Sequence, residues 1–141
     1  MTNYRDDISY EGSSYFVPME SDGVTILYDA TKQGNSAAYG LACTISANGT
    51  VALAGDGDPV FGKVGLVEAD GKVAVEKGIV TLPGGASATL TAGKPIIGDL
   101  GASSAKGYIQ NAVTTATTDV AVGRGEILDA STTTAVVVSL P

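Results

Sequence analysis

The sequence predicts a mainly β fold: a small compact β-barrel or β-tulip-like domain with an extended N-terminal arm. Nineteen glycines are spread over 141 residues, and the segments between them are short, rich in β-branched residues and mostly without a helical period. The apolar residues are largely Ala and Val, with two Phe and no Trp, which suits thin sheet packing. A chain of this length forms one domain. We therefore assign residues 1–22 to the arm and 23–141 to a single β domain.

The predicted arm differs in composition from the rest of the chain. Tyr4, Tyr10, Tyr15 and Phe16 stand among charged residues and serines, with no sustained strand or helical period. A free arm is normally poor in large apolar groups, and these rings gain free energy only by packing. Two interpretations remain open. The rings contact another protein or an adjacent subunit, or they fold back onto their own domain.

The predicted β domain is a series of short strands separated by glycine turns. The expected strands are 24–28, 50–54, 61–69, 72–82, 88–92, 94–98, 106–113, 124–129 and 134–140. Asp70-Gly71 is the strongest hairpin signal and predicts that 61–69 pairs with 72–82. Segment 36–45 fits either a short helix or a strand, and the polar run 114–119 is typical of an exposed loop.

The last predicted strand, TAVVVSL (134–140), is apolar on both faces because three valines follow one another. Such a strand is central in its sheet or covered by a neighbour. Apolar strands near the C-terminus are also one surface through which copies of the chain could associate.

Few residues in this chain are suited to catalysis. Histidine is absent, which removes the commonest general base and metal ligand. The carboxylates lie at turns and strand ends, where solvent keeps carboxyl pKa values near normal. Ser103-Ser104-Ala105-Lys106 has the spacing of an acyl-transfer motif but lacks the helix that the motif opens. We predict a non-enzymatic protein without a cofactor, a metal or a small-molecule substrate.

One stretch, GDGDPVFGKVG (55–65), has the glycine and lysine spacing of a phosphate-binding loop. Val64 stands where such a loop needs Ser or Thr, and the chain continues as a strand instead of a helix. Asp56 and Asp58 are too few carboxylates for a calcium loop. The stretch is therefore predicted to be a tight turn that leads into a strand.

Charge and cysteine content exclude further classes of partner. The net charge of −7 argues against nucleic acid, whose binding requires clustered Lys and Arg. Cys43 is the only cysteine, so no disulfide forms within the chain. No apolar run approaches the ~18–20 residues of a membrane span, and the N-terminus lacks the apolar core of a signal peptide. These features predict no membrane partner and synthesis in a reducing cytoplasm.

The order of elements after residue 55 resembles a known family. The runs FGKVGLVEADGKVAVEKGIVTLPGG (61–85), TLTAGKPII (89–97) and AVGRGEILDASTTTAVVVSLP (121–141) are similar to the small capsid decoration, or cement, proteins of tailed bacteriophages. Those proteins share a hairpin of the form G-x-x-x-V-x-x-G-x-V-x-L-P, a strand entry resembling TAGKP and a closing strand that begins near a Gly-Arg pair. The resemblance covers roughly the last 85 residues and consists of glycine and valine patterns.

The resemblance implies a structural component of the virion. Such proteins sit on the outside of the head, commonly as homotrimers at local three-fold positions, and clamp neighbouring major capsid protein subunits. It implies synthesis in the host cytoplasm and assembly onto the capsid exterior. The aromatic residues 4, 10, 15 and 16 are then expected to contact the capsid or an adjacent protomer. The alternative is a phage fibre or surface β module that binds carbohydrate or a receptor.

Overall fold

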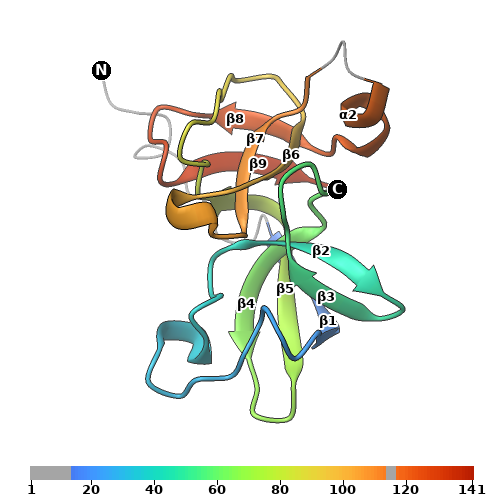
Figure 1. Ribbon diagram of the computed structural model, residues 1–141, viewed down its shortest axis with the longest axis vertical. Coiled ribbons are helices and arrows are strands. Elements are labelled where there is room, and N and C mark those ends of the chain that lie inside the picture. The colour runs from blue at the N-terminus through green and yellow to red at the C-terminus, as the bar shows by residue number, and fades with distance from the viewer. Residues whose placement is uncertain (1–13, 114–116) are drawn as a thin grey trace.

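Short strands build most of the molecule (Figure 1). The computed structural model describes residues 14–113 and 117–141. Its strands are β1 (Ser14–Ser21), β2 (Ala42–Ala47), β3 (Thr50–Leu53), β4 (Gly62–Val67), β5 (Lys72–Leu82), β6 (Ile96–Asp99), β7 (Tyr108–Asn111), β8 (Glu126–Asp129) and β9 (Val136–Leu140). Short helical turns are η1 (Gln33–Asn35), η2 (Ala102–Ser104) and α2 (Thr117–Val122). The prediction of a mainly β fold is confirmed.

Five strands close into a barrel, which forms the lower half of Figure 1. The order is β1-β3-β2-β4-β5, and β1 returns to pair with β5. The β1–β5 ladder is antiparallel and runs from Ser14 opposite Gly78 to Glu20 opposite Lys72. On its other edge β1 pairs in parallel with β3, where Glu20 lies opposite Thr50. Strand β1 therefore closes the barrel.

The structure differs here from the predicted arm, because residues 14–21 form β1. Val17 and Met19 pair with Val75 and Val73, and all four lie on the side of the barrel interior. The alternating residues of β1 point outward, and Pro18 and Glu20 among them obscured the period of two in the sequence. The structure describes no residue before Ser14, so Tyr4 and Tyr10 lie outside it.

Strand β5 joins two apolar cores. Its first half lies in the barrel, and beyond Gly78 it pairs with β9, which in turn pairs with β8. The barrel core is formed by Ile26, Ala38, Cys43, Val51, Val64, Val67, Val73 and Val75. The second core is formed by Ala42, Ala54, Val60, Val80, Leu82, Ile96, Ile109, Ile127, Val136, Val138 and Leu140. Because one continuous strand contributes to both cores, we expect them to unfold together.

Two hairpins of the barrel, β4–β5 and β2–β3, turn at glycines. Gly71 has a φ of +92°, which only glycine adopts readily, and its N–H donates to Glu68 O at 3.0 Å. Asp70 accepts a hydrogen bond from Lys72 N at 3.1 Å. These bonds join β4 to β5 as the Asp-Gly pair predicts. The hairpin between β2 and β3 turns in the same way at Gly49, whose φ is +68°.

Two predicted strands do not form, because side chains take the backbone donors that a ladder would use. In 24–28 the carboxylate of Asp22 accepts hydrogen bonds from the backbone N–H groups of Val24, Thr25 and Ile26. Burial opposes ionisation of Asp22, but these bonds and one from the Thr25 hydroxyl lower its pKa below 3.8. In 88–92 the side-chain oxygen of Asn111 accepts from Thr91 N at 3.0 Å.

The structure settles the ambiguous segment 36–45 and corrects the predicted loop at 114–119. Residues 36–40 form turns and β2 follows, so 36–45 is half turn and half strand. The polar run 114–119 was expected to be a loop, whereas its described part belongs to α2. Asp119, in the first turn of α2, accepts a hydrogen bond from Val113 N at 2.7 Å and so ties the helix to the end of β7.

The closing strand β9 is central, as its sequence predicts. It lies between β5 and β8, and Val136, Val137 and Val138 are all buried. Their side chains are enclosed by the chain's own fold, so this strand does not present an apolar surface for self-association. Large apolar groups are exposed elsewhere, above all on and around the barrel.

Candidate docking surface

The two described residues of the predicted contact set lie on β1 and are exposed. Tyr15 is 53% and Phe16 is 59% accessible. Tyr15 lies opposite Lys77 and Phe16 opposite Glu76, so the two rings leave β1 on different faces. Only Phe16 lines a hollow in the outer surface of the barrel.

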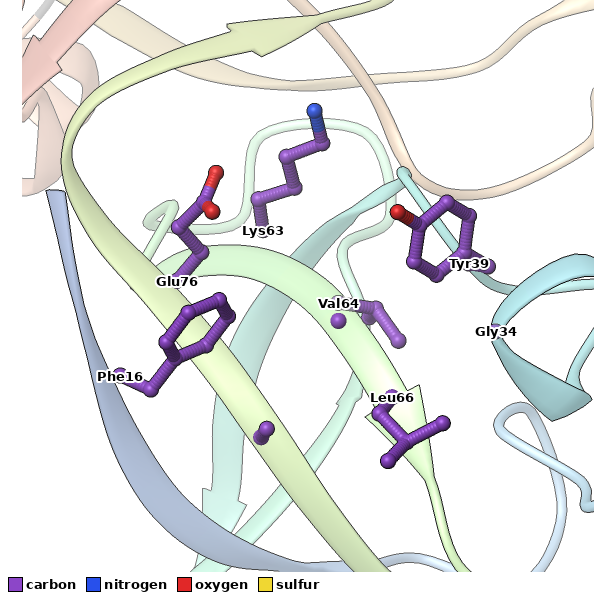
Figure 2. Close-up of a pocket in the computed structure, with 9 residues that line it drawn as sticks. Phe16, Gly34, Tyr39, Lys63, Val64, Leu66 and Glu76 are labelled. Carbon is purple, nitrogen blue, oxygen red and sulfur yellow. The ribbon is translucent and has the colours of Figure 1, made fainter. Parts of the chain in front are cut away.

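This hollow, which we call the aromatic hollow, has a volume of about 490 Å³. Figure 2 shows Phe16 and Tyr39 on opposite sides of it, with Leu66 at one end and Lys63 and Glu76 toward the other. Tyr39 and Leu66 are 40% and 47% exposed. The residues that line it are Phe16, Gly34, Tyr39, Lys63, Val64, Gly65, Leu66, Ala74 and Glu76.

Strand register places these side chains together. Glu76 on β5 lies opposite Phe16 on β1 and opposite Lys63 on β4, so all three leave the sheet on the same face. The ladder between β4 and β5 shifts register between Val64 and Val67. Such a bulge changes the direction of the side chains that it contains. Leu66 points outward, whereas Val64 and Val67 are buried.

Two glycines leave room for the rings. A Cβ on Gly65 would lie 2.5 Å from the carbonyl oxygen of Ala74 and 3.2 Å from the ring of Phe16. A Cβ on Gly34 would overlap the ring of Tyr39, and Gly34 has a φ of +63°. A side chain at Gly65 would therefore collide with the backbone of β5 and press on Phe16, whereas one at Gly34 would displace the ring of Tyr39. These glycines therefore shape the floor and one wall of the aromatic hollow.

A cation and an anion mark the polar end of the aromatic hollow. Lys63 donates from Nζ to Thr81 Oγ1 at 3.0 Å. Burial lowers the pKa of Lys63, and the nearby Glu76 carboxylate partly restores it. A surface with exposed rings and a polar rim is typical of protein–protein contacts. The arrangement can bind an apolar side chain or a short extended segment.

Groups elsewhere in the barrel are engaged in structural contacts. Lys77 lies 3.9 Å from the centroid of the Phe61 ring and donates to Phe61 O at 2.9 Å. Cys43 is buried, and its Sγ lies 3.4 Å from Gly62 O. Burial raises the pKa of the Cys43 thiol to about 12. The thiolate is therefore scarce at neutral pH, and this cysteine packs as a small apolar residue.

The stretch 55–65 is a tight turn that leads into β4, as predicted. Gly55 N donates to Asp58 Oδ2 at 2.8 Å, and Gly57 has a φ of +80°. Asp56 accepts from the Gln110 side chain at 3.0 Å. Within residues 14–113 and 117–141, no group of three or more Cys, Asp or Glu side chains is placed to hold a metal ion.

Comparison with known proteins identifies no relative. No family model, curated protein or solved structure matches the chain. No helix among the described residues is both long and apolar enough to cross a membrane.

Sequence reasoning found one ring of the aromatic hollow and missed the rest. Phe16 was singled out as an aromatic residue in a polar context, whereas Tyr39 and Leu66 were not assigned to any contact surface. Leu66 lies in a predicted strand, but the bulge that turns it outward has no signal in a single sequence. Tyr39 lies in a turn whose position against β4 depends on tertiary packing.

Proposed function

We propose that the protein is a non-enzymatic capsid decoration protein that binds the outer surface of a phage head and clamps neighbouring major capsid protein subunits. The structural observation that most supports this proposal is the aromatic hollow on the outer face of the barrel. The resemblance of residues 55–141 to cement proteins gives the class of partner.

The geometry supports a clamp in two ways. Phe16, Tyr39 and Leu66 project from different elements of a closed barrel, so little ordering entropy is lost when they bind. Exposed aromatic anchors beside a polar rim are the side chains that dominate protein–protein binding energies. Many copies on one shell would add such contacts by multivalency. We propose that the copies are arranged as homotrimers at local three-fold positions.

A second candidate is a surface module that binds carbohydrate or a receptor. Two rings that face each other beside Lys63 and Glu76 could also hold a sugar, since sugars stack on aromatic faces. The decoration proposal is preferred because the resemblance covers roughly the last 85 residues of the β domain, and no tryptophan is present to build a larger platform.

The deciding experiment uses shells assembled from the major capsid protein encoded with this chain. Purified protein is added, unbound protein is removed by sedimentation, and the particles are imaged by cryo-electron microscopy. Extra density at three-fold positions is the expected result. Density confined to a tail or fibre, or a strong glycan-array signal without shell binding, would contradict the proposal. Mass measurement in solution tests the trimer, and a stable dimer would count against it.

A further inference from the structure

A second hollow lies where the barrel meets the second core, beside the C-terminus that Figure 1 marks. Its volume is about 250 Å³. Leu140 at its wall belongs to the second core, whereas Phe61 packs against the barrel core. We call it the cationic hollow, and among the residues that line it are Thr44, Ile45, Phe61, Lys77, Arg124 and Leu140.

Positive charge distinguishes the cationic hollow. Lys77 and Arg124 supply two of the eight cationic side chains of the chain. In the described part of the chain, the residues that line this hollow include no Asp or Glu. The whole chain carries a net charge of −7, so the hollow is a local positive site on an acidic protein. Such a site attracts a negatively charged group.

Lys77 is held in place by the ring and the backbone of Phe61. Its Nζ lies 3.9 Å from the centroid of the ring and donates to Phe61 O at 2.9 Å. An ammonium group carries three N–H donors, so Nζ can also donate to an occupant of the hollow. Burial lowers the pKa of Lys77, and a partly desolvated ammonium attracts a carboxylate more strongly than a hydrated one.

The backbone at the end of α2 fixes the guanidinium of Arg124. Its Nη1 donates to Ala121 O at 3.3 Å and to Gly123 O at 3.0 Å. A guanidinium has five N–H donors, and those on Nε and Nη2 match the two oxygens of a carboxylate. Because Arg124 is already fixed through Nη1, it loses little further freedom when it binds such a group.

The hydroxyl of Thr44 gives a second, independent indication of a ligand. Thr44 is 8% exposed and lines the cationic hollow. Polar groups that are buried to this extent normally have a hydrogen-bond partner, and within residues 14–113 and 117–141 the Thr44 hydroxyl has none. An acceptor in the hollow would satisfy this hydroxyl. The next residue, Ile45, is 52% exposed and supplies an apolar wall.

We propose that the cationic hollow binds an acidic segment of a partner protein. A glutamate or aspartate carboxylate of this segment lies between Lys77 and Arg124, and a neighbouring apolar side chain packs on Ile45. A nucleic acid fits the hollow less well, since two cations on a chain of net charge −7 cannot offset a polyphosphate.

The assignment of the partner as the major capsid protein rests on the proposed function. Glu76 lines the aromatic hollow and Lys77 lines the cationic hollow. Because successive residues of a strand point to opposite faces, the two hollows lie on opposite faces of β5. Each copy would then hold one segment in each hollow, as a clamp between neighbouring capsid subunits requires.

Titration of the isolated, isotope-labelled protein with a short acidic peptide, followed by NMR, tests the hollow by itself. The probe is Ac-Ala-Leu-Glu-Ala-NH2, and Ac-Ala-Leu-Gln-Ala-NH2 is its uncharged control. Saturable shift changes at the amides of the lining residues are expected with the glutamate probe, and much weaker binding with the control. Equal binding of both peptides, or no shift change at the cationic hollow, would overturn the proposal. Inorganic phosphate is the third arm, and an equal affinity for phosphate would contradict recognition of a peptide.

Substitutions in the hollow assign the binding to particular groups. Lys77→Met and Arg124→Gln should each weaken binding of the glutamate probe about tenfold, because each removes a hydrogen bond to a charged group. Methionine keeps an apolar stem on Phe61. Lys32→Met makes the same charge change at an exposed lysine outside both hollows and should bind as wild type does. An equal loss for Lys32→Met would mean that net charge alone causes binding, which refutes the proposal.

Thr44→Val separates binding from stability. It replaces a buried hydroxyl by a methyl group, so the free energy of unfolding should stay unchanged or rise. Binding of the glutamate probe should become weaker, because one donor to the carboxylate is lost. A lower free energy of unfolding with unchanged binding would make Thr44 a structural residue and contradict its place in the site.

Shell binding distinguishes failure of this inference from failure of the proposed function. The double variant Lys77→Met with Arg124→Gln should bind shells at least about tenfold more weakly than wild type. Equal shell binding of both proteins would overturn this inference while the proposed function stands. If wild type itself does not bind shells, the proposed function fails, and the peptide titration still decides whether the hollow binds an acidic segment.

Discussion

Truncating Phe16 tests the aromatic hollow directly. A phenylalanine presents about 200 Å², and 59% exposure leaves roughly 120 Å² of Phe16 open to solvent. At about 25 cal/mol per Å², burying this area on a partner contributes about 3 kcal/mol, or roughly 100-fold in affinity for each site. The part already buried against the barrel accounts for at most about 2 kcal/mol of folding stability. Phe16→Ala should therefore weaken binding more than folding.

The assay is binding of labelled protein to shells at low occupancy, so that contacts between copies do not mask the effect. Urea unfolding of the same variant measures its stability. Leu27→Ala is the control, because Leu27 is 55% exposed but lines a different hollow. An unchanged affinity for Phe16→Ala, or an equal loss for Leu27→Ala, would refute the assignment of the aromatic hollow.

Three further predictions concern the fold. Leu82→Ala should lower the free energy of unfolding by about 2–5 kcal/mol, because Leu82 is fully buried in the second core. Urea unfolding of this variant should still show one transition. Two transitions would contradict the inference that β5 makes both cores unfold together. Cys43, whose thiol pKa is raised to about 12, should resist iodoacetamide at pH 8 until urea unfolds the protein, and rapid labelling of the folded form would contradict its burial. The pKa of Asp22 is lowered in the folded state, so its stabilisation is present above the unfolded pKa and is lost as pH falls. The difference in free energy of unfolding between wild type and Asp22→Ala should accordingly be constant near neutral pH and become smaller below about pH 3.8. A difference that grows below this pH would contradict the lowered pKa of Asp22.

Strands with strong local signals were predicted well from the sequence. Asp70-Gly71 selects a hairpin by its turn geometry, and 72–82 coincides with the whole of β5. The predicted strands 24–28 and 88–92 did not form, because side chains bind the backbone donors of both segments. Asp22 and Asn111 supply side-chain oxygens to backbone donors, and this competition depends on where each side chain lies after folding.

The candidate site was predictable only in part. An aromatic residue among charges draws attention to Phe16, but the same cue gave no reason to separate it from Tyr15. The period of two does separate them once β1 is known to be a strand. Tyr39 and Leu66 join the aromatic hollow through a turn and a bulge, whose directions are set by packing across strands.

The sequence by itself determined the class of fold, because glycine spacing, β-branched composition and turn chemistry act over a few residues. It also determined that 55–65 is a turn, since local chemistry excludes a phosphate loop there. Only the tertiary structure decided that residues 14–21 close the barrel, because strand pairing joins residues about 60 positions apart in the chain. The same long-range pairing placed Phe16 beside Glu76.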